Sequence, residues 1–156
     1  MNVNTATAMI TELGPLARIV AEYSGQMEKL ATAKGCTARD WEPLEQFVAI
    51  EAFQRVGAYQ EVMSWSEYVK FLTEWAGGTR FEMTLRRITE IGRLVIQEIE
   101  ERHYKGDQFI KKNVIAVYEF NERNQIRHLD IYEQAKDTGR WIAEAAQASS
   151  APGDGS

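Results

Sequence analysis

The stretch RLVIQEIEERHYKGDQFIKKNVIAVYEFNERNQIRHLDIYEQ, residues 93–134, decides the fold. Phe81, Met83 and Leu85, just before this stretch, stand at every second position, a spacing that predicts a β-strand, and the segments 93–104, 109–120 and 125–134 are predicted as three more strands. Turn-forming residues separate the three segments, with Gly106-Asp107 in the first gap and Asn121 to Asn124 in the second. The stretch therefore predicts a three-stranded antiparallel meander.

The residues before the meander favour helices. Apolar side chains recur at helical spacing from Pro15 to about Lys34-Gly35, and again after Thr37, which can cap a second helix. Ser64 and Glu67 form a capping box for a third. The remaining segments are predicted as a strand over 52–62 that bends at Gly57, a strand over 79–91 and a short helix over 135–147. Helices followed by a meander predict one α+β domain over 1–147, with a disordered tail over 148–156.

Composition excludes several classes of function. Hydrophobic residues make up 44% and charged residues 26%, as in ordinary globular domains. A net charge of −5 disfavours nucleic acid as a partner. Cys36 is the single cysteine and only two histidines occur, so we expect neither a disulfide nor a metal site. Neither a signal peptide nor a membrane span is evident, so we expect a cytoplasmic protein. The sequence carries no G-x-S-x-G elbow, P-loop or dinucleotide fingerprint, so we expect no cofactor.

Hairpin turns set which side chains share one face of the sheet. A first turn at Gly106-Asp107 places Gln97 opposite Ala116 and Val95 opposite Tyr118. A second turn centred on Arg123 extends these rows to the last strand. The predicted rows are Val95–Tyr118–His128, Gln97–Ala116–Asp130 and Ile99–Val114–Tyr132, with Glu101 one row beyond, near Lys112 and Gln134.

Two interpretations of this face remain open. The opposite face carries Ile96, Ile115, Val117, Leu129 and Ile131, so it can be the core while the polar row is solvated. Yet the first face is also rich in apolar residues, and a sheet that is apolar on both sides is covered on both sides. The helices would then enclose a pocket on one side, and a second copy of the chain would cover the other.

The order of these elements resembles a known family. Three helices, the segment FQRVGAYQEVMSWSEYVKFL and the closing VYEFNERNQIRHLDIYEQ are similar to the SnoaL-like branch of the NTF2-like superfamily, over roughly residues 15–145. The resemblance implies an α+β cone, in which helices pack on a curved sheet around an apolar pocket, and pairing of two copies through the outer sheet face. Members include limonene-epoxide hydrolases, ketosteroid isomerases, polyketide cyclases, dehydratases and lyases, and others only bind ligands.

The resemblance also implies candidate catalytic residues. Its epoxide hydrolases use an Arg-x-Asp on the strand before the hairpin and a second Asp on the last strand. Glu101 stands at the first Asp position, Ile99 at the Arg position, and Asp130 at the second Asp position, although a one-residue shift would put Ile131 there. The ketosteroid isomerases instead use a Tyr and a protonated Asp, a pair that Asp130 with Tyr118 or Tyr132 can imitate.

Each candidate has a functional and a structural interpretation. Asp130 is the leading catalytic candidate, because a carboxylate beside Val114 and Ala116 would be desolvated; the alternative is a buried Asp paired with Arg or a backbone donor. Arg55 can bind a substrate oxygen or form a salt bridge with Glu90 or Glu61. The full set comprises catalytic candidates Asp130, His128, Glu101 and Tyr132 and substrate-binding candidates Tyr118, Arg55, Tyr23 and Gln97. Packing of the aromatic residues, a structural role for the histidine and a solvated acidic face are the alternatives.

The sequence therefore predicts a cofactor-independent acid–base enzyme for a small apolar or aromatic ring compound, and the partial motif favours epoxide hydrolysis. Isomerisation, dehydration and formaldehyde-releasing carbon–carbon lysis of a phenolic substrate stay open, since all begin with a proton transfer. A protein that binds a hydrophobic metabolite without converting it is the alternative from another class. The expected partners are the small molecule and a second copy of the chain.

Overall fold

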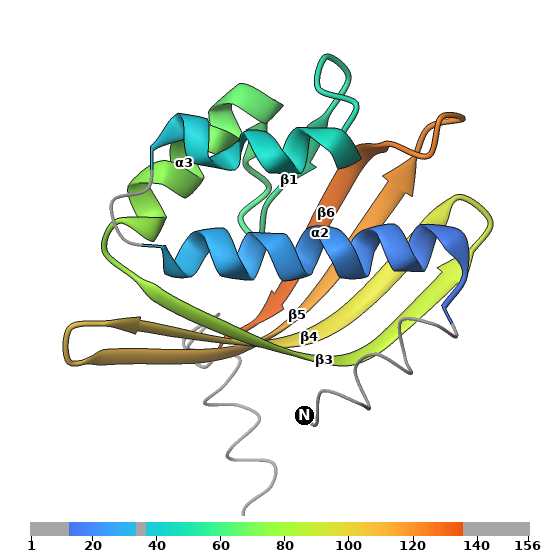
Figure 1. Cartoon of the computed structure of the whole chain (residues 1–156). Helices are drawn as coiled ribbons and strands as arrows, with labels where there is room; N and C mark the ends of the chain where they lie inside the picture. Colours follow the sequence, from blue (N-terminus) through green and yellow to red (C-terminus); the bar gives the residue numbers. More distant parts are fainter. Residues whose placement is uncertain (1–12, 34–36, 136–156) are drawn as a thin grey trace, which may run out of the picture.

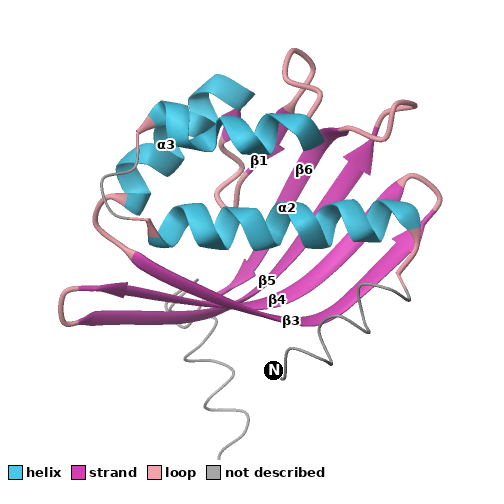
Figure 2. Cartoon of the chain, viewed as in Figure 1, coloured by secondary structure: helices cyan, strands magenta, loops and turns pink. Residues whose placement is uncertain are grey.

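A computed structural model describes residues 13–33 and 37–135 of the chain. Over these residues three helices pack on a six-stranded mixed sheet that does not close into a barrel (Figures 1 and 2). The elements are α2 (Pro15–Thr32), η1 (Ala38–Phe47), β1 (Gln54–Val56), β2 (Val62–Met63), α3 (Trp65–Ala76), β3 (Arg80–Ile91), β4 (Leu94–Lys105), β5 (Gln108–Phe120) and β6 (Ile126–Gln134). The predicted α+β class is confirmed. The helix predicted over 135–147 lies outside the described residues from 136 onward, as does the predicted tail.

The helices begin at the residues that the sequence predicted, and one of them differs in helix type. Pro15 stands at the first turn of α2, where its missing N–H costs nothing. Ser64 Oγ accepts a hydrogen bond from the Glu67 backbone N–H (3.3 Å) and begins α3. The helix that follows Thr37 is a 3₁₀-helix rather than an α-helix. Pro43 lies inside it, and a proline lacks the backbone N–H that an α-helix needs there.

The strand order is β2-β1-β6-β5-β4-β3, and every neighbouring pair is antiparallel except β1 and β6. The segment predicted as one bent strand over 52–62 is a short hairpin, β1 and β2, joined by a turn in which the Gly57 backbone N–H donates to the Glu61 carbonyl oxygen (2.9 Å). The β4–β5 register is as predicted: Gln97 lies opposite Ala116, and Val95 opposite Tyr118.

The predicted β5–β6 register is wrong by one residue. Next to the turn, Phe120 lies opposite Ile126 as predicted, but the next pair is Glu119 and His128. Arg127 is thus an extra residue, a β-bulge, and its guanidinium pairs with the Glu119 carboxylate at 2.6 Å. Side chains alternate between faces along a strand, so one extra residue moves every later side chain to the other face.

The helices α2, η1 and α3 all lie on one face of the sheet, here called the inner face (Figure 1). The buried core joins these helices to that face and includes Val20, Trp41, Leu44 and Val95. The outer face carries exposed apolar side chains, among them Ile115 and Tyr132. The predicted pairing of two copies through this face stays a prediction. Over the described residues, no helix is both long and apolar enough to cross a membrane.

Candidate functional site

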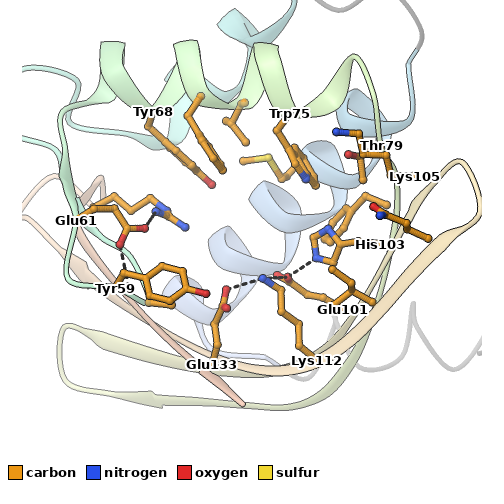
Figure 3. Close-up of a pocket in the computed structure, with 18 residues that line it drawn as sticks. Tyr59, Glu61, Tyr68, Trp75, Thr79, Glu101, His103, Lys105, Lys112 and Glu133 are labelled. Atoms are coloured by element: carbon orange, nitrogen blue, oxygen red, sulfur yellow. Dashed lines mark hydrogen bonds and ion pairs between the residues drawn. The ribbon is translucent and has the colours of Figure 1, made fainter. Parts of the chain in front are cut away.

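Two adjoining cavities lie on the inner face. The outer chamber has a volume of about 550 Å³, and a narrower recess of about 90 Å³ reaches Tyr23, Gln97 and Tyr118. Six residues line both spaces and so mark where they join: Met27, Arg55, Tyr68, Phe81, Glu101 and Glu133. Figure 3 shows the chamber, with Tyr68 and Trp75 on the helical side and Glu101, Lys112 and Glu133 on the sheet side.

Three charged side chains form a cluster in this chamber. Glu101 on β4 lies directly opposite Lys112 on β5, and Glu133 projects from the neighbouring strand β6. The Lys112 Nζ atom lies 2.6 Å from Glu133 Oε1 and 3.8 Å from Glu101 Oε2 (Figure 3). All three side chains are less than one-fifth exposed. One ammonium group therefore stands between two carboxylates from different strands.

His103 extends the cluster along β4. It lies two residues after Glu101, so both side chains project from the inner face. The His103 Nε2 atom lies 2.9 Å from Glu101 Oε2 (Figure 3). The imidazole packs against the rings of Trp75 and Phe81, with centroids 5.7 and 5.1 Å away. These rings hold the imidazole in place, and the imidazole in turn orients the Glu101 carboxylate.

Three tyrosines line the recess. The Tyr118 hydroxyl donates to Gln97 Oε1 (3.2 Å), and Gln97 Nε2 donates to Ser24 Oγ (2.8 Å), so a polar chain joins β5, β4 and α2. Burial raises the pKa of Tyr23, Tyr68 and Tyr118 above the ordinary value of a phenol. Phenols with raised pKa values stay protonated at neutral pH, so they can donate a hydrogen bond to an oxygen that gains negative charge.

The Tyr23 hydroxyl is buried without a well-formed hydrogen bond in the described part of the chain. No hydrogen bond of normal geometry reaches it from the described residues, although Tyr68 is close enough to raise its pKa. A buried hydroxyl without a partner is uncommon in proteins. The hydroxyl can therefore donate to an acceptor placed in the recess.

Arg55 enters the cavity from β1. Its guanidinium carbon lies 4.8 Å from the centroid of the Tyr68 ring and 5.9 Å from that of Phe71. The salt bridge with Glu61, one of the two predicted structural alternatives, is present, with 3.6 Å between Nη1 and Oε1. Arg55 nevertheless lines both cavities, so its ion pair does not remove it from the site.

The structure brings together five of the eight predicted site residues. Glu101, Tyr118, Arg55, Tyr23 and Gln97 all line the recess.

The placement of Asp130, His128 and Tyr132 on this face is wrong. The Arg127 bulge puts Ile131 opposite Ala116 and Leu129 opposite Tyr118, and turns the other three side chains to the outer face. There the His128 Nε2 atom lies 3.0 Å from Asp130 Oδ1, and Tyr132 is 60% exposed.

Sequence reasoning missed four residues of the site, each for a different reason. His103 follows Glu101 by two positions, so alternation alone places it on the inner face. Lys112 was expected near Glu101 but only as a neighbour. Glu133 could be placed on the inner face only by predicting the β-bulge. The sequence signal for that bulge is the spacing of three residues between apolar Ile126 and Leu129, which interrupts the alternation. Tyr68 shares a helical stripe with core residues, and nothing in the sequence separates it from them.

The described residues contain no group of three His, Cys, Asp or Glu side chains arranged to hold a metal ion. The polar inventory of the cavity is instead a carboxylate–ammonium–carboxylate cluster, an imidazole, phenols and one guanidinium. Such a set can move protons and stabilise a developing oxyanion.

Comparison with solved structures places the fold. No protein-family model and no curated protein sequence matches the chain. An LEH-like epoxide hydrolase of M. tuberculosis matches with a TM-score of 0.63 at 14% identity, over 86% of this chain and 95% of that one. A candidate SnoaL-like polyketide cyclase from Jannaschia sp. CCS1 matches with a TM-score of 0.60 at 12% identity, over 90% and 98%.

A third matching structure is that of a protein described only by its fold. The NTF2-like protein of unknown function from Cytophaga hutchinsonii ATCC 33406 matches with a TM-score of 0.53 at 13% identity, over 78% of this chain and 92% of that one. The chain has the NTF2-like fold. The resemblance drawn from the sequence is confirmed at this level, and at such identities the likeness concerns the fold alone.

Proposed function

We propose that the protein is a cofactor-independent acid–base enzyme for a small, largely apolar ring compound, and that Glu101 and Glu133 are its proton-transferring groups. The observation that carries this proposal is the position of Lys112 between the two carboxylates, at 3.8 and 2.6 Å, inside the inner-face chamber. Apolar rings line the same space, among them Phe71, Trp75 and Phe81, and would bind the body of the substrate.

The two carboxylates have different surroundings, which suits different roles. Glu133 holds the short contact with Lys112, at 2.6 Å. Glu101 lies further from Lys112 and pairs with His103, which can supply or receive a proton. A pair of carboxyl groups in unlike environments can divide the work of base and acid.

Hydrolysis of an epoxide is the reaction that this pair supports best. One carboxylate removes a proton from water while the water oxygen attacks a ring carbon. The carbon–oxygen bond of the epoxide breaks, and the other carboxyl group gives a proton to the departing oxygen, so that a diol forms. The family resemblance implied two acids, one on the strand before the hairpin and one on the last strand. Glu101 on β4 and Glu133 on β6 meet that description, with Lys112 as the cation instead of an arginine.

A second reaction class has its own support in the recess. Isomerisation, dehydration or carbon–carbon lysis needs one base and a donor for the oxygen that gains charge. Glu101 is near enough to affect the pKa of Tyr68 and Tyr118, and all three line the recess with Tyr23. Phenolic substrates fit this arrangement, since the phenols and Arg55 would face the substrate oxygen.

The test is mass spectrometry of products from a mixed panel of cyclic epoxides, unsaturated ketosteroids and phenolic aryl-propane diols. A product heavier by one water identifies a hydrolase, and in H₂¹⁸O that product carries one labelled oxygen. An unchanged mass at a new retention time identifies an isomerase. A loss of water or of formaldehyde identifies a dehydratase or a lyase. Binding without any product identifies a ligand-binding protein.

Three variants assign the chemistry to the cavity. We expect Glu101→Gln and Glu133→Gln each to lower kcat by about 10²- to 10⁴-fold, the usual contribution of a positioned acid or base. Asp130→Asn is the matched control: it removes a carboxylate from the same sheet that pairs with a histidine on the outer face. Full turnover in both glutamine variants, or an equal loss in the control, would contradict the proposal.

A further inference from the structure

Arg55 is a buried cation, and two of its three guanidinium nitrogens make no hydrogen bond of normal geometry with the described residues, although the guanidinium is close enough to the Tyr68 hydroxyl to oppose the rise in the pKa of that phenol. Its side chain is 12% exposed, and its Nε and Nη1 atoms are buried with no hydrogen-bond partner in the described part of the chain. The nearest carboxylate, Glu61, stays at 3.6 Å, and its other oxygen accepts from the Tyr59 backbone N–H (2.9 Å). The Arg55–Glu61 contact is therefore an ion pair without a hydrogen bond.

This arrangement leaves binding capacity in the cavity. A buried charged donor without a hydrogen bond costs more than a neutral one, and an oxygen supplied from outside would recover that cost. The rings of Tyr68 and Phe71 lie against the guanidinium and fix its position. Lys112, by contrast, is already engaged by Glu133 at 2.6 Å. Arg55 thus offers a prearranged cation with unused donors.

We propose that the ligand of this cavity carries an anionic oxygen, a phenolate or a carboxylate, on its apolar body, and that Arg55 binds this oxygen and sets the specificity of the site. The inference deepens the proposed function, on which it rests for the cavity and for the reacting end at Glu101 and Glu133. Arg55 lines both the chamber and the recess, so an oxygen bound there can belong to a ligand that extends into either.

Charge in the cavity also sets the orientation of such a ligand. Glu101 and Glu133 project from β4 and β6, whereas Arg55 projects from β1 and lies against α3. An anionic end is repelled by the two carboxylates and attracted by Arg55. The ligand would therefore place its anion at Arg55 and its reacting atoms at the carboxylate pair. Glu61 competes with the ligand for the same guanidinium.

The experiment compares anionic probes with neutral probes of the same shape. The phenolate arm uses 4-nitrophenol and 4-nitroanisole, and the carboxylate arm uses 2-naphthoate and methyl 2-naphthoate, each titrated against the protein. We expect the anions to bind more tightly, and Arg55→Gln to weaken the anions by about 10- to 100-fold, the range for a lost hydrogen bond to a charged group. Affinity for the neutral probes should stay unchanged. The arm with the larger selectivity identifies the kind of oxygen.

4-Nitrophenol also reports its own ionisation state, because the phenol and the phenolate absorb at different wavelengths. Near the pKa of the probe, wild-type protein should raise the phenolate fraction, and Arg55→Gln should abolish this rise. Arg80→Gln is the matched control, since Arg80 also stacks on a tyrosine, Tyr104, at 4.0 Å but does not line either cavity. Equal affinity for anionic and neutral probes in the wild type would overturn the proposal.

Glu61→Gln provides a second test that does not depend on whether the Arg55→Gln variant folds. It leaves Arg55 in place and removes the carboxylate that competes for it, so anion affinity should rise. A fall in anion affinity would count against Arg55 as the binding residue.

Glu101→Gln separates this inference from the proposed function. It should lower kcat by about 10²- to 10⁴-fold while it keeps or strengthens anion binding, because a negative charge has been removed. If the wild-type protein prefers anions but converts no substrate, only the proposed enzymatic function is contradicted. If it converts a substrate but does not prefer anions, only the proposed role of Arg55 is contradicted.

Discussion

Two carboxylate–imidazole pairs stand on opposite faces of one sheet. Glu101 and His103 on β4 lie 2.9 Å apart, and His128 and Asp130 on β6 lie 3.0 Å apart. Each pair spans two residues of a strand, so the local geometry is nearly the same. The first pair faces a cavity beneath helices, and the second faces outward. Spacing along a strand therefore produces the pair, but the face decides what the pair can do.

The surroundings of the two pairs show why the face matters. Around Glu101 and His103 lie the rings of Trp75 and Phe81 and the ammonium of Lys112, all within one cavity. The outer pair has no such enclosure, and both of its side chains are about one-quarter to one-third exposed. Water screens charges there and competes for each hydrogen bond. Of these two pairs, only the inner one lies within a cavity, where we propose that it exchanges a proton with the substrate.

The largest expected effect is on the free energy of unfolding, when an apolar and a charged residue at neighbouring positions of β6 are each replaced by the other type. Leu129 is 2% exposed on the inner face, so Leu129→Asp would bury a charge and should lower the free energy of unfolding by at least about 3 kcal/mol. Asp130→Leu, on the outer face, should change it by less than about 1 kcal/mol. Urea unfolding of both variants measures the difference. The opposite order would mean that the Arg127 bulge does not set the faces.

The sequence allowed the strands and the first hairpin to be predicted because their signals are local. Gly106-Asp107 fixes the turn, and regular alternation then carries the register to Glu101 and Lys112. The same reasoning failed on β6 because it assumed that alternation continues past Arg127. An apolar residue at 126 and the next at 129 break that rule. This interruption of the alternation is visible in the sequence, and it moves His128 and Asp130 to the outer face.

Other parts of the site depend on contacts that no local pattern encodes. Arg55 reaches the cavity because β1 pairs in parallel with β6, a strand that follows much later in the chain. Tyr68 lies on the same stripe of α3 as buried Trp65 and Leu72, and only the position of Arg55 distinguishes it. Long-range pairing of this kind follows from the whole fold, so residue type and spacing could nominate Arg55 but could not place it.

A medium effect is expected at alkaline pH, and it separates the inner tyrosines from the rest. Burial raises the pKa of Tyr23, Tyr68 and Tyr118 in the folded state, whereas the unfolded chain ionises them near the ordinary value of about 10. Above that pH the unfolded state binds fewer protons than the folded state, so stability is complete below it and falls as pH rises. The slope should approach about 1.4 kcal/mol per pH unit for each tyrosine.

Urea unfolding between roughly pH 9 and 11 measures this slope, a window set by the ordinary tyrosine pKa. Tyr118→Phe should make the decline shallower, and it should also cost stability at neutral pH because Gln97 Oε1 loses its donor. Tyr132→Phe, on the outer face, is the control. A slope unchanged in Tyr118→Phe would mean that Tyr118 is not kept protonated by burial.

The smallest effects concern the two histidines and compare the faces directly. His128→Ala removes an exposed partner of Asp130 and should change stability by less than about 1 kcal/mol without an effect on turnover. His103→Ala removes a ring that packs against Trp75 and Phe81, two contacts worth about 0.5–1.5 kcal/mol each. It should also lower kcat with little change in KM, because Glu101 loses the group that orients it. Equal losses of kcat in both variants would show that the face of the sheet does not govern the role of the pair, whereas a loss confined to His103→Ala ties the chemistry to the inner face.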